Sequence, residues 1–307
     1  MQRRTLLHAL VAGGLAPAAA LADPWRDVLD TPTQPSALAS RGLITGLARA
    51  GRRVVAVHFP LPDAGWAVGH DGVVLKSVRP SSTLGEKLVA WYAANGDAKW
   101  LAEAKRIAAQ GAENPFLDVW FDDALRGIVV GAFGLALRTT DGGATWEPLM
   151  HVADNPKALH LYGVRRIGGA LYAVGEQGLL LRQEADGRLA ALPIPYQGTL
   201  FGLVGNDRGA VLAYGLRGNL VRSSDAGRSW QPKATDIGVG LVAATVDERG
   251  RFIVASQAGH VLVSRDDGAS FAAANVERLL PTAALASAGP DALVLGGPRG
   301  VRTLALA

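Results

Sequence analysis

The sequence of 307 residues contains no cysteine. This absence excludes disulfide bonds, thiolate nucleophiles and cysteine-ligated zinc or iron–sulfur sites. The six histidines form no HxH or HExxH pattern, and no Gly-x-Ser-x-Gly elbow, P-loop or dinucleotide-binding fingerprint occurs. We therefore expect no metal, no cofactor and no catalytic residue.

Charged residues are sparse as well, at 19% of the chain, and the formal net charge is +4. A nucleic-acid-binding protein would carry a clustered basic stripe with interleaved aromatic residues, and the sequence has no such stripe. Beyond the N-terminal residues there is no run of the roughly 20 apolar residues that a membrane-spanning helix needs. We expect a monomer with no nucleic-acid partner and at most a peripheral association with a membrane.

The N-terminus has the pattern of a secretory signal peptide. Arg3 and Arg4 precede an apolar stretch over residues 6–20, and the Ala-Leu-Ala of residues 20–22 forms a small-x-small cleavage site. We predict a signal peptide over residues 1–22, cleavage after Ala22 and a periplasmic location. Paired arginines are also typical of a twin-arginine signal, so both export routes stay open. An uncleaved anchor is less favoured because the apolar stretch is short for a span.

A Gly-x-x-Gly turn between two short apolar runs recurs along the chain. Its first residues are spaced by 62, 44, 40, 41 and 41 residues, at Gly69, Gly131, Gly175, Gly215, Ser256 and Gly297. Glycine reaches the positive φ that a tight hairpin turn requires. A period near 40 residues matches the four short strands of one propeller blade. We predict an all-β protein, a single β-propeller over residues 41–307 with six blades, or alternatively seven.

A second motif, Ser/Thr-x-Asp-x-Gly-x-x-aromatic, occurs three times and is known as the Asp-box. Its aspartate can accept backbone N–H groups inside the turn, its glycine allows an unusual φ, and its aromatic residue can pack back on the blade. We expect structural roles for the nine residues concerned, which are Asp141, Gly143, Trp146, Asp225, Gly227, Trp230, Asp266, Gly268 and Phe271.

The long first interval contains an insertion at about residues 81–110. Apolar residues recur there at helical spacing on both sides of Asn95 and Gly96. This pattern predicts two short amphipathic helices joined by a turn. Upstream, residues 52–57 run directly into the next repeat without a turn and an Asp-box, so most of one blade is missing from the pattern.

The combination of motifs resembles the photosystem II stability/assembly-factor family of Asp-box propellers, in the branch found in bacteria that need not be photosynthetic. The resemblance is carried by four segments, at residues 66–72 (WAVGHDG), 114–121 (NPFLDVWF), 195–202 (PYQGTLFG) and 215–219 (GLRGN). It implies a propeller, usually of seven blades, that is exported and helps to assemble or support a membrane complex. In non-photosynthetic members it implies a partner that resembles an exporter of the resistance–nodulation–division type. The function expected from this resemblance is that of a non-catalytic scaffold.

Two groups of residues are candidates for partner binding. Four residues after the second turn glycine, successive repeats place Lys76, Arg138, Arg182 and Arg222. Equivalent positions of a rotational repeat fall on one circle, so these cations could form a basic patch for an acidic partner. The alternative is that each pairs with a nearby carboxylate. Tyr196 and Phe201 could anchor an interface, or they could pack between neighbouring blades.

Two other functional classes stay open. A glycan- or small-ligand-binding propeller would need a pocket lined by exposed aromatic residues. Sialidases also contain Asp-boxes, but a sialidase-like glycoside hydrolase would need an arginine cluster and a tyrosine with a carboxylate partner. Its Arg-Ile-Pro signature is absent, because Arg166 and Ile167 are followed by Gly168.

Overall fold

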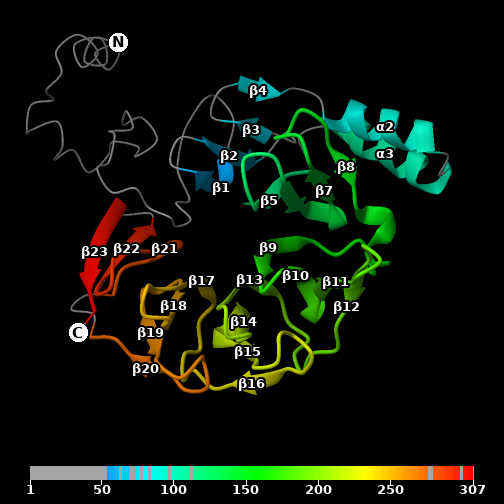
Figure 1. The fold of residues 1–307 in the computed structure, drawn as a ribbon. Helices are drawn as coiled ribbons and strands as arrows, with labels where there is room; N and C mark the ends of the chain where they lie inside the picture. The colour runs from blue at the N-terminus through cyan, green and yellow to red at the C-terminus, as the bar shows by residue number, and fades with distance from the viewer. Residues whose placement is uncertain are drawn as a thin grey trace, which may run out of the picture. The chain divides into compact units, whose positions relative to one another are not determined.

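The computed structural model describes residues 54–61, 64–69, 74–76, 79–81, 84–95, 98–110, 114–275, 279–297 and 300–306. The predicted signal peptide at residues 1–22 and the predicted start of the propeller at residue 41 lie outside these ranges. The described residues form six antiparallel sheets that follow one another in chain order (Figure 1).

The first three sheets have four strands each, and their strands hydrogen-bond in sequence order. The first contains β1 (Val54–Leu61), β2 (Ala64–Gly69), β3 (Val74–Lys76) and β4 (Arg79–Ser81). The second contains β5 (Phe116–Phe121), β6 (Gly127–Gly131), β7 (Ala136–Thr139) and β8 (Glu147–Pro148). The third contains β9 (Leu161–Ile167), β10 (Ala170–Gly175), β11 (Leu180–Gln183) and β12 (Leu189–Ala191).

The last three sheets repeat this pattern, except that the sixth has three strands. The fourth contains β13 (Leu200–Gly205), β14 (Val211–Gly215), β15 (Leu220–Ser223) and β16 (Gln231–Lys233). The fifth contains β17 (Leu241–Val246), β18 (Phe252–Ser256), β19 (Val261–Ser264) and β20 (Ala272–Ala273). The sixth contains β21 (Ala284–Ser287), β22 (Ala292–Gly297) and β23 (Gly300–Ala305).

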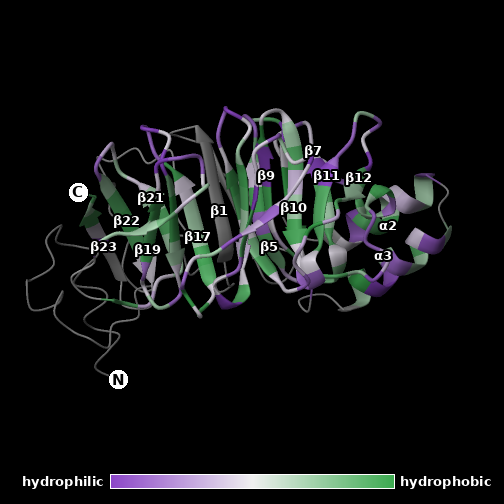
Figure 2. Cartoon of the chain, turned by 90° about the horizontal axis from the view of Figure 1, so that it is seen from below, coloured by the Kyte–Doolittle hydropathy of each residue, from purple (hydrophilic) through white to green (hydrophobic). Residues whose placement is uncertain are grey.

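The first strand of each sheet contacts the first strand of the next, from β1 through β5, β9, β13 and β17 to β21. Side chains of adjacent sheets interdigitate, and the second strands β6, β14 and β18 are buried along their whole length. Figure 2 shows apolar residues concentrated along the strands and hydrophilic ones in the loops at the strand ends. The predicted fold class, an all-β propeller with a helical insertion, is confirmed, with six blades in the described part of the chain.

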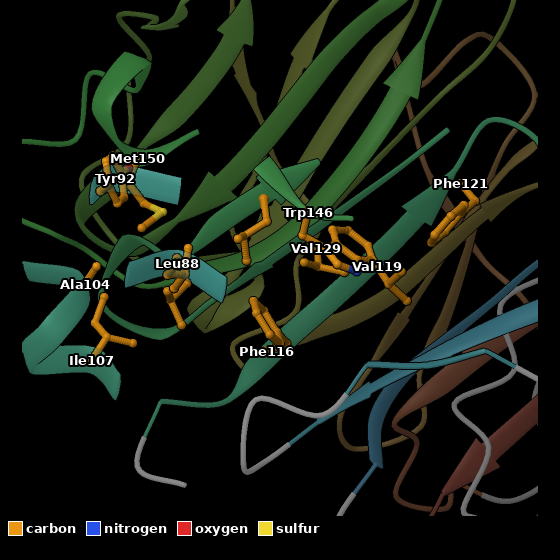
Figure 3. Close-up of a cluster of buried hydrophobic side chains, with 12 residues drawn as sticks. Leu88, Tyr92, Ala104, Ile107, Phe116, Val119, Phe121, Val129, Trp146 and Met150 are labelled. Atoms are coloured by element: carbon orange, nitrogen blue, oxygen red, sulfur yellow. The ribbon is translucent and has the colours of Figure 1, made fainter. Parts of the chain in front are cut away.

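The insertion is a helical hairpin made of α2 (Leu84–Asn95) and α3 (Ala98–Gln110), which packs on the second sheet. Leu88 and Tyr92 from α2 and Ile107 from α3 lie in one cluster with Phe116 and Trp146 of the blade (Figure 3). The half-buried Trp91 and Trp100 pack against this cluster. The hairpin therefore extends the apolar core of the second blade.

In the repeat turns of the second and third blades, the two glycines are required for different reasons. The second glycine has the positive φ expected from the sequence, at 71° in Gly134 and 74° in Gly178. The first glycine is extended instead, with φ of −168° in Gly131. A Cβ atom on Gly131 would lie 2.3 Å from the carbonyl oxygen of Pro115. The expectation of positive φ was wrong for this first position, where close backbone approach excludes a side chain.

A buried ion pair joins the second and third blades. One carboxylate oxygen of Asp118 accepts the Val164 N–H at 2.8 Å and also the Nη1 group of Arg165. Asp118 is 5% exposed. Burial raises the pKa of this carboxyl, while the Arg165 charge and the main-chain donors oppose that shift. The Arg165 guanidinium also lies 5.6 Å from the centre of the Trp120 ring.

We expect Asp118→Ala to lower the free energy of unfolding by about 3 kcal/mol, because it leaves a largely buried guanidinium and a buried N–H without their acceptor. Urea denaturation followed by tryptophan fluorescence measures this loss. Asp118→Asn keeps an oxygen acceptor for the Val164 N–H, so it should lower the free energy of unfolding clearly less than the alanine substitution does. Equal stability of the alanine variant and the parent would show that the pair does not hold the blades together.

Candidate functional site

The Asp-box residues make their hydrogen bonds inside their own loops. The Asp225 carboxylate accepts the N–H of Ser229 at 2.9 Å and the hydroxyl groups of Ser229 and Ser223 at 2.7 Å each. Asp141 and Asp266 accept the same three kinds of bond. These carboxylates are therefore occupied by the turns they close.

The glycines and aromatic residues of the boxes complete this arrangement. Gly143, Gly227 and Gly268 have φ of 85°, 80° and 79°, and each donates its N–H to the first hydroxyl of its box at 2.8 Å. Trp146 and Trp230 are buried, and Phe271 is half-buried against the neighbouring apolar cluster. The hydrogen bonds of the box aspartates and of the box glycine N–H groups are therefore those that a turn requires.

The cations predicted from the repeat occupy equivalent places on the third strands of four consecutive sheets. Lys76 lies opposite Trp66 in the register of β2 and β3, but the position of its side chain is not described. Arg138 pairs with Glu147 at 2.7 Å, and Arg182 lies 3.6 Å from Glu184. Neither of these two pairs uses an Asp-box carboxylate.

Arg222 is bound differently, because its Nε donates to the main-chain oxygen of Asp267 at 2.6 Å. Tyr196 and Phe201 lie toward the other end of the sheets. Both are half-buried, and the Tyr196 hydroxyl donates to the Leu216 oxygen at 3.3 Å. The structure does not gather these six candidate residues at one site.

A cleft of about 620 Å³ opens between the second and third blades. Arg138 lines it together with Arg126 and Arg166, and Trp120 forms an aromatic part of the wall. Asp122 is the one acidic residue of the lining, and the carboxylates of Asp123 and Glu147 pair with Arg126 and Arg138 beside it. The repeat pattern identified Arg138 only. Arg126 follows β5 and Arg166 lies near the end of β9, where no sequence motif marks them.

Each cleft arginine is held through its Nε atom by a carboxylate. Arg138 donates to Glu147 at 2.7 Å, and Arg126 donates to Asp123 at 2.8 Å. Arg166 donates to both oxygens of Asp122, at 2.9 and 2.8 Å. Among the described residues, the terminal nitrogens of Arg138 have no hydrogen-bond partner. An arginine anchored in this way can still offer its terminal nitrogens to a planar oxyanion.

Asp122 links two walls of the cleft, because it also accepts the Nε1–H of Trp120 at 2.9 Å. The pair of Asp122 and Arg166 crosses from the second blade to the third. The shape of the cleft thus depends on the packing of two blades.

Within the described ranges, no group of three or more histidine, aspartate or glutamate side chains is placed to hold a metal ion. None of the described helices has the length and apolarity to cross a membrane.

Comparison with known proteins agrees with the family resemblance of the sequence motifs. The family model described as photosynthesis system II assembly factor YCF48 matches residues 99–231. The expected resemblance to this family is confirmed. The matched segment contains every cleft residue named above. A curated relative, the photosystem II assembly lipoprotein Ycf48 of Synechococcus sp. (strain CC9902), is 25% identical over 169 residues, or 53% of this chain and 50% of that protein. The chain thus spans about half the length of this curated relative.

Three solved structures align with parts of this chain. A YCF48 bound to a D1 peptide is 18% identical, with a TM-score of 0.47 over 62% of this chain and 67% of that one. YCF48 from Cyanidioschyzon merolae is 16% identical, with a TM-score of 0.46 over 63% and 72%. The computationally designed Ika8 protein is 11% identical, with a TM-score of 0.57 over 83% and 71%. At 11% identity the likeness to the Ika8 protein concerns the fold alone.

We expect the Asp-boxes to make the protein sensitive to acid. Hydrogen bonds from the Ser270 hydroxyl, the Ser270 N–H and the Ser264 hydroxyl lower the pKa of Asp266 to about 2. The pKa of Asp225 is lowered in the same way, and the hydrogen bond from the Ser229 hydroxyl is the largest cause. An unfolded aspartate titrates near pH 3.9. The folded pKa is depressed, so the stabilisation is present above about pH 4 and is lost as pH falls toward 2.

Urea denaturation at a series of pH values between 2 and 7 checks this expectation. Asp225→Asn combined with Asp266→Asn should be less stable than the parent at pH 7 and should show a flatter decline below pH 4. Parallel curves for the parent and the variant would contradict it.

Proposed function

We propose that this protein is an exported, non-catalytic scaffold that helps to assemble a membrane protein complex, and that the arginine cleft binds an acidic segment of the partner. The observation that carries this proposal is the convergence of Arg126, Arg138 and Arg166 on one cleft inside the segment that matches the assembly-factor family. Three cations with carboxylate-anchored guanidinium groups favour a carboxylate-bearing ligand.

The geometry supports a definite mode of binding. The Nε anchors hold the guanidinium groups in place before a ligand arrives, which reduces the side-chain entropy lost on binding. The two terminal nitrogens of Arg138 would bind a carboxylate in a bidentate manner. Trp120 would contact the apolar part of the segment. Because the cations are partly exposed, the affinity should fall as salt concentration rises.

The nature of the partner rests on the resemblance. The curated relative bears the name of a photosystem II assembly lipoprotein, and a solved relative holds a D1 peptide. For this chain we propose a membrane protein complex in contact with the periplasm, to which the protein binds peripherally and as a monomer. A transporter of the resistance–nodulation–division type is the specific hypothesis that the sequence resemblance adds.

The binding mode is tested with the purified chain and a fluorescein-labelled acidic octapeptide by fluorescence anisotropy. Arg138→Lys keeps the charge but loses the planar fork, so we expect affinity to fall about tenfold, the equivalent of about 1.4 kcal/mol. Arg222→Lys, on the equivalent strand outside the cleft, is the matched control and should keep the parental affinity. Equal affinity of both lysine variants and the parent would contradict binding in the cleft.

A second substitution should strengthen binding. Glu147→Gln removes the negative charge beside Arg138, while its amide oxygen can still accept the Nε–H group. We expect the acidic peptide to bind about two- to fivefold more tightly, as the loss of one competing surface charge implies. Titrations at low and high salt measure this gain, which should shrink at high salt. Weaker binding by this variant would show that Glu147 acts only as an anchor.

The assembly role needs a partner from the cell. The chain is used to recover proteins from detergent-solubilised membranes, in parallel with a variant carrying Arg126→Gln and Arg138→Gln. Recovery of one membrane complex by the parent and its loss with the variant would support the proposal. Recovery of the same complex by both proteins would remove the cleft from the interface.

A further inference from the structure

At two blade junctions, an Asp-box loop covers the blade that precedes it in the chain. Arg222 of the fourth blade donates its Nε–H to the main-chain oxygen of Asp267, in the box of the fifth blade, at 2.6 Å. One junction earlier, the Tyr172 hydroxyl of the third blade donates to the main-chain oxygen of Ala226, in the box of the fourth blade, at 2.8 Å. Asp267 and Ala226 hold the same place in their boxes, just before the glycine, and both have φ of 57°. A box therefore offers this one carbonyl oxygen to the blade before it.

The box glycine lets the loop come this close to its neighbour. A Cβ atom on Gly268 would lie 2.6 Å from a methyl carbon of Leu212, and one on Gly227 would lie 2.7 Å from the Tyr172 hydroxyl oxygen. Leu212 and Tyr172 occupy corresponding positions on the second strands β14 and β10, each opposite the third-strand arginine of its blade. Because the glycines pack directly on them, these two side chains are 0% and 1% exposed.

The third blade has a shorter turn at the place of the box. Its strands β11 and β12 are joined by the five residues 184–188, whereas β15 and β16 are joined by the seven box residues 224–230. The short turn closes on itself, because the Gly187 N–H donates to the Glu184 oxygen at 3.0 Å and the Arg188 side chain pairs with Asp186 at 2.7 Å. The second blade is therefore the one of these three that a box of the next blade does not cover.

The arginine cleft lies where a box of the third blade would pack. Ile128 is opposite Arg138 in the register of β6 and β7, which is the position that Leu212 holds in the fourth blade. It lines the cleft and is 7% exposed, whereas Leu212 is 0% exposed. Gln183, the last residue of β11, stands where the box would begin, and it lines the cleft as well. Arg138 turns its Nε–H to Glu147, where Arg222 of the fourth blade binds a box carbonyl.

We propose that the partner protein inserts a tight turn of the Asp-box type into this cleft, in place of the box that the third blade does not supply. A left-handed residue followed by glycine would pack over Ile128 and present its carbonyl oxygen to Arg138. An acidic side chain at the left-handed position would suit the cations of the cleft, as the Asp267 carboxylate pairs with Arg208 of the preceding blade at 3.0 Å. The inference rests on the proposed function, since it specifies the conformation of the acidic segment that the cleft binds.

The test uses the purified chain and two fluorescein-labelled peptide rings closed by a disulfide, which the protein leaves intact because it contains no cysteine. One ring is Cys-Ser-Ser-Asp-Asp-Gly-Ala-Ser-Phe-Cys, and the other has valine in place of the glycine. Valine keeps the charge, but it disfavours the left-handed turn and adds side-chain atoms that would collide with Ile128. Anisotropy titration should show the glycine ring binding about tenfold more tightly than the valine ring and than an open acidic peptide of the same charge.

A loop graft tests the same site within the chain. Residues 184–188 are replaced by Ser-Asp-Ala-Gly-Arg-Ser-Trp, the sequence of residues 224–230, together with Gln183→Ser. The third blade then has a complete box, which should cover Ile128 and fill the cleft. We expect a higher melting temperature and loss of binding of the glycine ring. The comparison of the rings needs no variant, so it decides the matter even where the graft does not fold.

The outcomes separate this inference from the proposed function. Equal binding of both rings and the open peptide, all weakened by Arg138→Lys and none by Arg222→Lys, would overturn the turn and keep an acidic ligand in the cleft. No binding of any of the three peptides to the parent would overturn both. Undiminished binding of the glycine ring by a folded graft would place the turn outside the cleft and would also overturn the inference.

Discussion

Each blade of this protein has two apolar faces and cannot bury either of them alone. The second strand of a blade lies between two neighbouring sheets, which is why β6, β14 and β18 are buried throughout. Stability comes from the contact of one blade with the next, and so every other feature of the molecule must allow that contact. The helical hairpin obeys the same constraint, because α2 and α3 add their apolar residues to the core of the second blade.

Close contact between blades depends on residues without side chains at particular points. Gly163 on β9 lies against Gly202 on β13, where a Cβ would be 3.0 Å from the Gly202 Cα. At the equivalent position on β5 the chain has Asp118 instead of glycine. Because the two blades are close there, its carboxylate binds the Val164 N–H and the Arg165 guanidinium of the next blade. One inter-blade joint is therefore polar, and it adjoins Trp120 of the cleft.

The two ends of the propeller differ in chemistry because different kinds of loop occur there. Asp-box loops close on themselves through Asp225 and its equivalents, and the carboxylate-paired arginines of the cleft lie at the same end. The turns at the other end present the strained Phe133, Gln177 and Arg217 to solvent.

The sequence by itself determined the repeat, the class of fold and the turns that follow Gly131, Gly175 and Gly215, because a turn is built from neighbours in the chain and its glycines are visible in the pattern. It also identified Arg138, which lies at a repeat position. It could not identify Arg126 and Arg166 as its companions, because they come from non-equivalent positions that meet only when two blades pack. The same holds for the edge-to-face contact between the rings of Tyr162 and Phe201, which are 39 residues apart in the sequence. Turns and hydrogen bonds between neighbours in the chain can be predicted from the sequence, whereas the convergence of side chains from different blades is decided by tertiary packing.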